Sequence, residues 1–228
     1  MIKKSNIPDF IIIGAAKCGT TTIANILNMH PRIVMAKPKE PNFFNPQGNF
    51  QKGRDWYYSC FGIKNNTLNK NVIYGEASTY YSMRTRYPDV AKTIRRAVPD
   101  CKLIYIVRDP VERMISHWRM IKRDWFEAPP FDQILDHNYL KKMVVDISKY
   151  WFQISVYRKL FNSKNILVLF LEDYVNNTKM ELKKIYDFLE LEKGIGFVGG
   201  AMKLSLILLR HQKAGHHFFW KLAGITIS

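Results

Sequence analysis

The chain has 228 residues, and its formal net charge of +16 comes from 35 Lys and Arg against 19 Asp and Glu. With 47% hydrophobic and 14% aromatic residues, the composition excludes a mostly disordered chain, and the length predicts a single domain over residues 1–228. Three cysteines, Cys18, Cys60 and Cys101, form no C-x-x-C pair and no even-numbered set. The sequence therefore predicts no disulfide framework and a reducing, cytoplasmic location.

The positive charge predicts an anionic partner: a phosphorylated cofactor, an acidic polymer or a membrane surface. Nucleic acid is not expected, because the basic residues are spread along the whole chain and no zinc pattern, RNP motif or arginine-rich arm is present. The first ten residues hold no long apolar run, so neither a signal peptide nor an integral membrane segment is expected.

Five apolar runs bounded by turn residues predict buried parallel strands over residues 10–14, 32–36, 72–76, 102–107 and 165–171. Helical patterns lie between and after them, over residues 20–29, 53–60, 85–97, 110–123, 147–162 and 178–190. This alternation predicts an α/β fold in which helices cover both faces of a parallel sheet. Ligands of such sheets bind beyond the carboxyl ends of the strands, so the residues after each strand are candidates for the site.

The first predicted strand runs into the loop GAAKCGTTT, residues 14–22. Gly14 and Gly19 are spaced as in the G-x-x-x-x-G-K-[ST] loop that binds ATP or GTP, but the lysine that should follow the second glycine lies inside the loop, as Lys17. A helix beginning near Thr20 offers free N–H groups and its positive dipole end to a phosphate. A lysine in mid-loop suits a donor whose reacting group sits on a single 5′-phosphate, which disfavours kinase chemistry.

A later strand is predicted to end at Arg108, Pro110 opens the next helix, and Ser116 lies two turns into it. A guanidinium at a strand tip and a hydroxyl on the adjoining helix can hold a second phosphate. An equally supported alternative is a structural ion pair of Arg108 with Asp109 or Glu112. Because Asp109 stands beside the guanidinium, no clear magnesium ligand follows a strand.

Four motifs, in chain order, resemble the PAPS-dependent sulfotransferases, in particular the branch with the heparan sulfate sulfotransferases and their bacterial relatives. They are PDFIIIGAAKCGTTTIANIL, KPKEPNFF, YGEASTYY and IVRDPVERMISHWRM. With a later strand–helix segment, the likeness spans residues 8–191. The resemblance implies a P-loop-type three-layer fold with a central parallel sheet. It also implies transfer of a sulfuryl group from 3′-phosphoadenylyl sulfate (PAPS) to a hydroxyl or amine of a carbohydrate or glycolipid acceptor, with release of PAP and without a metal.

The resemblance implies roles for individual residues. The glycine loop would hold the 5′-phosphosulfate of PAPS, through Lys17, Cys18, Gly19, Thr20, Thr21 and Thr22. Arg108 and Ser116 would hold the 3′-phosphate. Glu40 would be the catalytic base and Lys17 would stabilise the leaving group, with Lys39 beside the base as a substrate-binding residue.

The sequence also departs from the family in two places. Related carbohydrate sulfotransferases often have E-K-[TS] after the third strand, but here Ala77 replaces the lysine, and Glu76 remains as a candidate substrate-binding residue. Lys37 and Lys39 are candidates to supply the missing cation. Residues 192–228 are atypical for the family or truncated. Two alternatives therefore stay open: a P-loop nucleotide kinase, and a catalytically inactive relative that binds a polyanion or a membrane.

Overall fold

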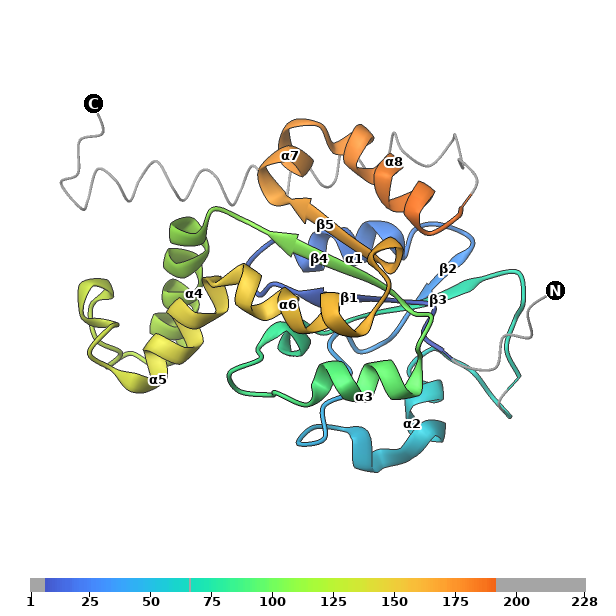
Figure 1. Cartoon of the computed structure of the whole chain (residues 1–228), viewed down its shortest axis with the longest axis horizontal. Helices are drawn as coiled ribbons and strands as arrows, with labels where there is room; N and C mark the ends of the chain where they lie inside the picture. Colours follow the sequence, from blue (N-terminus) through green and yellow to red (C-terminus); the bar gives the residue numbers. More distant parts are fainter. Residues whose placement is uncertain (1–6, 66, 192–228) are drawn as a thin grey trace.

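The computed structural model describes residues 7–65 and 67–191. Its centre is a five-stranded parallel sheet with the order β2-β3-β1-β4-β5 (Figure 1). The strands are β1 (Phe10–Gly14), β2 (Ile33–Met35), β3 (Ile73–Ala77), β4 (Lys102–Val107) and β5 (Ile166–Phe170). The predicted parallel sheet is confirmed, while the atypical segment 192–228 lies outside the described residues.

Helices cover both faces of this sheet, as predicted. They are α1 (Thr20–Leu27), α2 (Gly53–Ser59), α3 (Val90–Ala97), α4 (Pro110–Asp124), α5 (Asn138–Leu140), α6 (Tyr150–Leu160), α7 (Leu171–Asn176) and α8 (Thr178–Phe188). In Figure 1, α1 and α8 lie on one side of the sheet, and α3 and α6 pack together on the other. Because β1 to β2 and β3 to β4 run in opposite directions across the sheet, right-handed crossovers put α1 and α3 on opposite faces.

The central strand β1 forms the middle of the core. Phe10, Ile11, Ile12 and Ile13 are completely buried, which explains why this strand is an unbroken apolar run rather than an alternating one. Each such side chain contributes about 1.5–3 kcal/mol by leaving water. The Phe10 ring lies against Gly75 of β3, where a Cβ would meet its Cζ at 2.1 Å.

The structure differs from the predicted elements mainly at helix ends. Helix α3 begins at Val90 rather than at residue 85, because Pro88 disfavours helical geometry in the residue before it. A short 3₁₀ turn, Thr79–Ser82, follows β3, where the sequence patterns predict no element. The sequence patterns do not predict the short helices α5 and α7 or the π-helical turn Lys141–Val145.

Helix α4 has a well-defined start at the end of β4. The Asp109 side chain caps the helix by accepting a hydrogen bond from the N–H of Glu112 at 2.8 Å, and Pro110 takes the first helical position. The backbone N–H of Asp109 donates to Glu172 at 2.9 Å, which ties this start to α7. These contacts fix the start of α4 between the end of β4 and α7.

Candidate active site

A pocket of about 330 Å³ lies at the carboxyl ends of β1 and β3, beside α4, where the sheet topology predicts a ligand site. Its wall includes most of the predicted site residues: Lys17, Gly19, Thr20, Thr21, Thr22, Lys39, Glu40 and Ser116. Segments that are far apart in the sequence therefore meet around one cavity. We call this cavity the loop pocket.

The loop before α1 presents its helix end to the loop pocket. Gly19 is the N-cap of α1 and has φ +77, so no side chain covers the first turn. The positive φ favours glycine at this position, and a Cβ there would also push aside Cδ1 of Leu171, which it would meet at 2.7 Å. The first-turn N–H groups and the helix dipole attract an anion, and the hydroxyls of residues 20–22 add further donors.

Lys17 lies in the middle of this loop with a left-handed backbone, φ +70. Its Nζ lies 3.7 Å from Sδ of Met120. Burial, and then the nearby positive charges of Arg123, Arg108 and Arg113, lower the pKa of Lys17. A partly buried cation among other cations favours binding of an anion, and an anion in the loop pocket can contact Lys17.

Glu40 reaches the loop pocket from the segment after β2. Its Oε1 accepts a hydrogen bond from Nζ of Lys39 at 2.7 Å, and the Thr79 hydroxyl lies 3.2 and 3.1 Å from its two carboxylate oxygens. The Glu40 side chain is 28% exposed, so an incoming molecule can contact it. Lys39 lines the pocket while Lys37 is exposed and is not part of its wall, so Lys39 is the better candidate for the cation that Ala77 does not supply.

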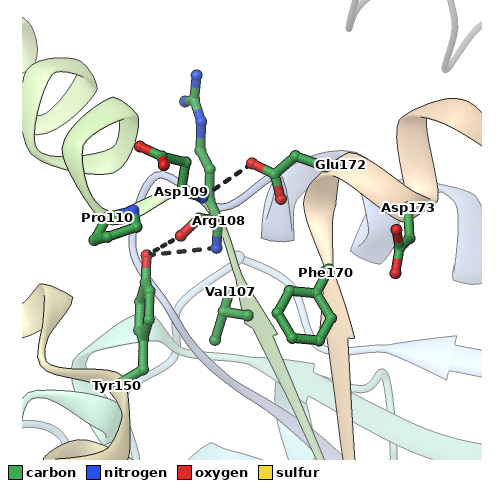
Figure 2. A pocket seen from close by; sticks show the side chains of 8 residues that line it. All are labelled: Val107, Arg108, Asp109, Pro110, Tyr150, Phe170, Glu172 and Asp173. Carbon is green, nitrogen blue, oxygen red and sulfur yellow. Dashed lines mark hydrogen bonds between the residues drawn. The ribbon is translucent and has the colours of Figure 1, made fainter.

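A second pocket, of about 510 Å³, lies between the carboxyl ends of β4 and β5. Figure 2 shows Arg108 and Tyr150 on one side of it and Phe170 and Glu172 on the other. The Tyr150 hydroxyl donates to the carbonyl oxygen of Arg108 at 2.8 Å. This pocket combines aromatic rings with charged groups.

The guanidinium of Arg108 makes one of the two structural ion pairs left open by the sequence. Its Nη2 lies 3.3 Å from Oε2 of Glu112, one turn into α4. Ser116, farther along the same helix, lines the loop pocket, whereas Arg108 lines the second pocket. The structure does not bring Arg108 and Ser116 into one pocket, so their joint hold on a phosphate stays a prediction.

Two predicted site residues face the interior, which corrects their expected roles. The Cys18 side chain is buried, with its Sγ 3.8 Å from the Tyr150 hydroxyl, and burial raises the pKa of the thiol to about 11. The backbone N–H of Cys18 donates to the carbonyl of Ala15. Glu76 is fully buried on β3, where its Oε2 accepts a hydrogen bond from the Tyr57 hydroxyl at 2.7 Å. A carboxyl group inside the core, outside the wall of the loop pocket, does not bind an acceptor there.

The buried carboxyl of Glu76 makes stability depend on pH. Burial raises its pKa from 4.5 to about 7, so between these values the folded chain keeps a proton that the unfolded chain has lost. Folding stability therefore falls as pH rises through this window. We expect Glu76→Gln to remove that loss, so that urea unfolding shows the variant gaining about 2 kcal/mol on the wild type between pH 5 and pH 8. A difference that does not change with pH would contradict this.

Sequence reasoning missed two residues of α4 that lie beneath the loop. Arg113 is fully buried, and its Nη1 donates to the Ala16 carbonyl of the loop at 3.4 Å. Its Nε donates to the Ser148 hydroxyl at 2.6 Å, and its Nη2 donates to the Val144 carbonyl. Nη1 also lies 3.1 Å from Nδ1 of His117, which must accept because a guanidinium only donates. Burial, and then the charge of Arg113, lower the pKa of His117 to about 3. His117 is therefore a neutral support of the loop, and not a base.

The spacing of these two residues was visible in the sequence. Arg113 and His117 are four residues apart and so share one face of α4, with Ser116 beside them. Nothing in the sequence shows, however, that this face turns toward the carbonyl of the glycine loop. That placement depends on the packing of α4 against residues 141–148, where Arg113 donates to Ser148 and Val144.

The family model described as "Sulfotransferase domain" matches residues 7–197. It covers most of the chain, including every residue of the loop pocket. The chain belongs to the sulfotransferase family, and both the resemblance seen in the sequence and the expected fold are confirmed.

Individual relatives agree with this assignment. The chain is 33% identical over 135 residues to the membrane-associated sulfotransferase kil1 of Dictyostelium discoideum, covering 58% of this chain and 27% of the relative. It is 29% identical over 194 residues to human heparan sulfate glucosamine 3-O-sulfotransferase 3B1, covering 82% of this chain and 47% of the relative. The chain therefore spans less than half the length of these two relatives.

Solved structures show the same fold. A sulfotransferase from Alicyclobacillus acidocaldarius is similar with a TM-score of 0.71 and 25% identity, covering 82% of this chain and 83% of that one. Mouse sulfotransferase SULT7A1, solved in complex with PAP, has a TM-score of 0.59 and 19% identity, covering 88% of this chain and 65% of that one. The second likeness concerns the fold alone.

Residues 7–65 and 67–191 hold neither a metal-binding cluster nor a membrane-spanning helix. No three His, Cys, Asp or Glu side chains in this part of the chain are grouped so that they could hold a metal ion. None of its helices combines the length and the apolar character needed to cross a membrane.

Proposed function

We propose that this sulfotransferase takes the sulfuryl group from PAPS, delivers it to a hydroxyl, or with less support an amine, of a carbohydrate or glycolipid acceptor, and releases PAP. One observation carries the proposal. The loop pocket brings together the open N-terminus of α1, the Lys17 ammonium and the Glu40 carboxylate. An anion-binding helix end, a cation and a base are what in-line transfer between two oxygens requires.

The residues divide the transfer between them. The first-turn N–H groups of α1 hold the 5′-phosphosulfate, and Lys17 stabilises the negative charge that grows on the bridging oxygen as the sulfur–oxygen bond to the phosphate breaks. Glu40 accepts the proton of the acceptor hydroxyl as its oxygen bonds to sulfur. Lys39, 2.7 Å from Glu40, stands where it can also balance the charge on the sulfuryl oxygens.

The second pocket suits the rest of the donor. Its wall includes the rings of Tyr150 and Phe170, and Phe170 is exposed enough to stack on a base. Arg108 lines the same pocket and offers a guanidinium for the 3′-phosphate, in exchange for its present pairing with Glu112.

We assign the acceptor to the part of the loop pocket around Tyr80, which has aromatic and basic character. Tyr80 lines the pocket and meets Tyr87 edge to face, with ring centroids 5.8 Å apart. The Arg86 guanidinium lies 5.3 Å from the centre of the Tyr87 ring. Rings of this kind bind the apolar faces of sugars, and arginine binds carboxylates and sulfates, so an acidic sugar chain fits this side. The net charge of +16 and the names of the heparan sulfate relatives support the same acceptor class.

Thermal shift with four nucleotides tests the donor. We expect PAP and PAPS, without magnesium, to raise the melting temperature, because a ligand at 100 times its Kd adds about 2.7 kcal/mol of stability. For a domain of this size that corresponds to a rise of about 5–10 °C. ATP and GTP, with or without magnesium, should give a much smaller shift.

The alternatives give different results in the same experiments. A nucleotide kinase would be stabilised by ATP with magnesium and not by PAP. A catalytically inactive binder would be stabilised by heparan sulfate while producing no sulfated glycan from labelled PAPS. The reducing, cytoplasmic location stays a prediction, which fractionation of the source cells would test.

A further inference from the structure

Glu40 lies in the segment 40–44, and hydrogen bonds tie this segment to residues 77–81, at and after the end of β3. Three of its backbone N–H groups donate to residues 77–81: Glu40 to the Ala77 carbonyl at 3.0 Å, residue 42 to the Ser78 hydroxyl at 3.1 Å, and residue 44 to the Tyr81 hydroxyl at 3.0 Å. Every second residue from 40 to 44 is thus bonded to the motif GEASTYY. This motif fixes the path of the base-bearing segment.

Thr79 is the member of this motif that contacts the carboxylate itself. Its Oγ1 lies 3.2 Å from Oε1 and 3.1 Å from Oε2 of Glu40, while Lys39 donates only to Oε1. Thr79 is 7% exposed, so its hydroxyl has little water to compete for it. Glu40 has φ +60, a strained conformation for a non-glycine residue that persists only when its surroundings hold it.

On the proposed function of this site, we propose that Thr79 is a positioning residue that holds the Glu40 carboxylate for proton transfer. Lys39 occupies Oε1, and the hydroxyl of Thr79 restrains the plane of the carboxylate so that Oε2 faces the acceptor. In the transfer step the acceptor oxygen bonds to sulfur, the bond from sulfur to the phosphate oxygen breaks, and the acceptor proton moves to Oε2. Thr79 lines the loop pocket beside Glu40, and in this proposal it acts on the transfer through the Glu40 carboxylate.

The alternative is that Thr79 only stabilises the start of the 3₁₀ turn. Such a role predicts a lower melting temperature and a loss of activity that does not depend on Glu40. The positioning role predicts a loss that exists only when Glu40 is present, because residues that act through one another are not additive. The two roles therefore differ in a double-mutant cycle.

The experiment measures kcat and KM for PAPS in Thr79→Val, Thr79→Ser and Glu40→Gln, and in the double variant of Thr79→Val with Glu40→Gln. We expect Thr79→Val, which keeps the shape without the hydroxyl, to lower kcat by about 10-fold to 100-fold. KM for PAPS and the affinity for PAP should stay unchanged, and Thr79→Ser should stay within about 3-fold of the wild type, because it keeps the hydroxyl that positions the carboxylate. In the Glu40→Gln background, Thr79→Val should cause no further loss. Thr93→Val on α3, away from the pocket, is the matched control.

Three outcomes overturn the inference. One is wild-type kcat in Thr79→Val, and another is an equal loss in the wild-type and Glu40→Gln backgrounds. The third is failure of Thr79→Ser to keep activity while its melting temperature is unchanged. If Thr79→Val does not fold, Thr79→Ala takes its place in the same cycle. A wild-type protein that binds PAP but sulfates no glycan or glycolipid overturns the proposed function as well, so the two failures are distinguishable.

Discussion

Lys17→Ala is expected to lower sulfuryl transfer by about 10²–10³, the usual cost of removing one preorganised charge-stabilising group. The Lys17 ammonium is partly buried in the loop pocket, and its Nζ lies 3.7 Å from the thioether sulfur of Met120. Burial and neighbouring cations lower the pKa of Lys17, so its positive charge is costly at this place and an anionic donor reduces that cost. The relief is greatest when charge develops on the bridging oxygen.

The measurement is kcat/KM with labelled PAPS and a heparan-type acceptor. Lys92→Ala is the matched control, because Lys92 lies on α3 with its side chain 59% exposed and pairs only with Asp89 among the ion pairs of the described residues. It changes the net charge equally without touching the pocket, so its rate should equal that of the wild type. A normal rate in Lys17→Ala would remove Lys17 from the proposed mechanism.

Much of the site could be predicted from the sequence because its main part is local. The apolar run 10–13, the two glycines and the threonines that open α1 are contiguous, and their physical requirements are short-range: buried strand, tight turn, open helix end. Lys17 lies between the two glycines, so the formation of the turn also places Lys17 in the loop pocket.

The errors concern the direction of side chains. Glu76 pairs in register with Ile11 on the neighbouring central strand, and its carboxyl is fully buried where the Tyr57 hydroxyl reaches it. Whether a strand residue faces the core or the site depends on the helix that packs there, here α2, which lies about twenty residues earlier in the chain. The Cys18 side chain likewise turns toward Tyr150, on α6, which the loop sequence does not reveal.

Arg113 shows why the second layer of the site was also missed. Arginine is rarely buried, so a sequence pattern predicts that it lies on the surface or binds an anion. Here it holds the Ala16 carbonyl beneath the glycine loop and fixes His117 as a neutral acceptor. The cation therefore acts as a support for the loop and contributes to the positive field that lowers the pKa of Lys17. Loop geometry and pocket charge are linked through this one side chain.

Glu40→Gln should lower turnover by about 10²–10⁴, the range expected when a general base is removed. Glutamine keeps the size of the side chain, and its carbonyl oxygen can still accept the hydrogen bonds that Lys39 and Thr79 donate in the wild type. It does not take the acceptor proton. The affinity for PAP should therefore stay within about 3-fold of the wild type, because the first turn of α1 and the lysine of the loop are unchanged.

The test compares kcat with the Kd of PAP in the same preparation. Glu190→Gln serves as the control, because its carboxylate is exposed and pairs with Lys102 on β4. If turnover falls and the affinity for PAP holds, Glu40 acts on the acceptor. If both fall together, Glu40 instead holds the pocket in shape through Lys39 and Thr79, and the base has to be sought elsewhere on the wall. His117 is excluded there because its Nδ1 already accepts from Arg113.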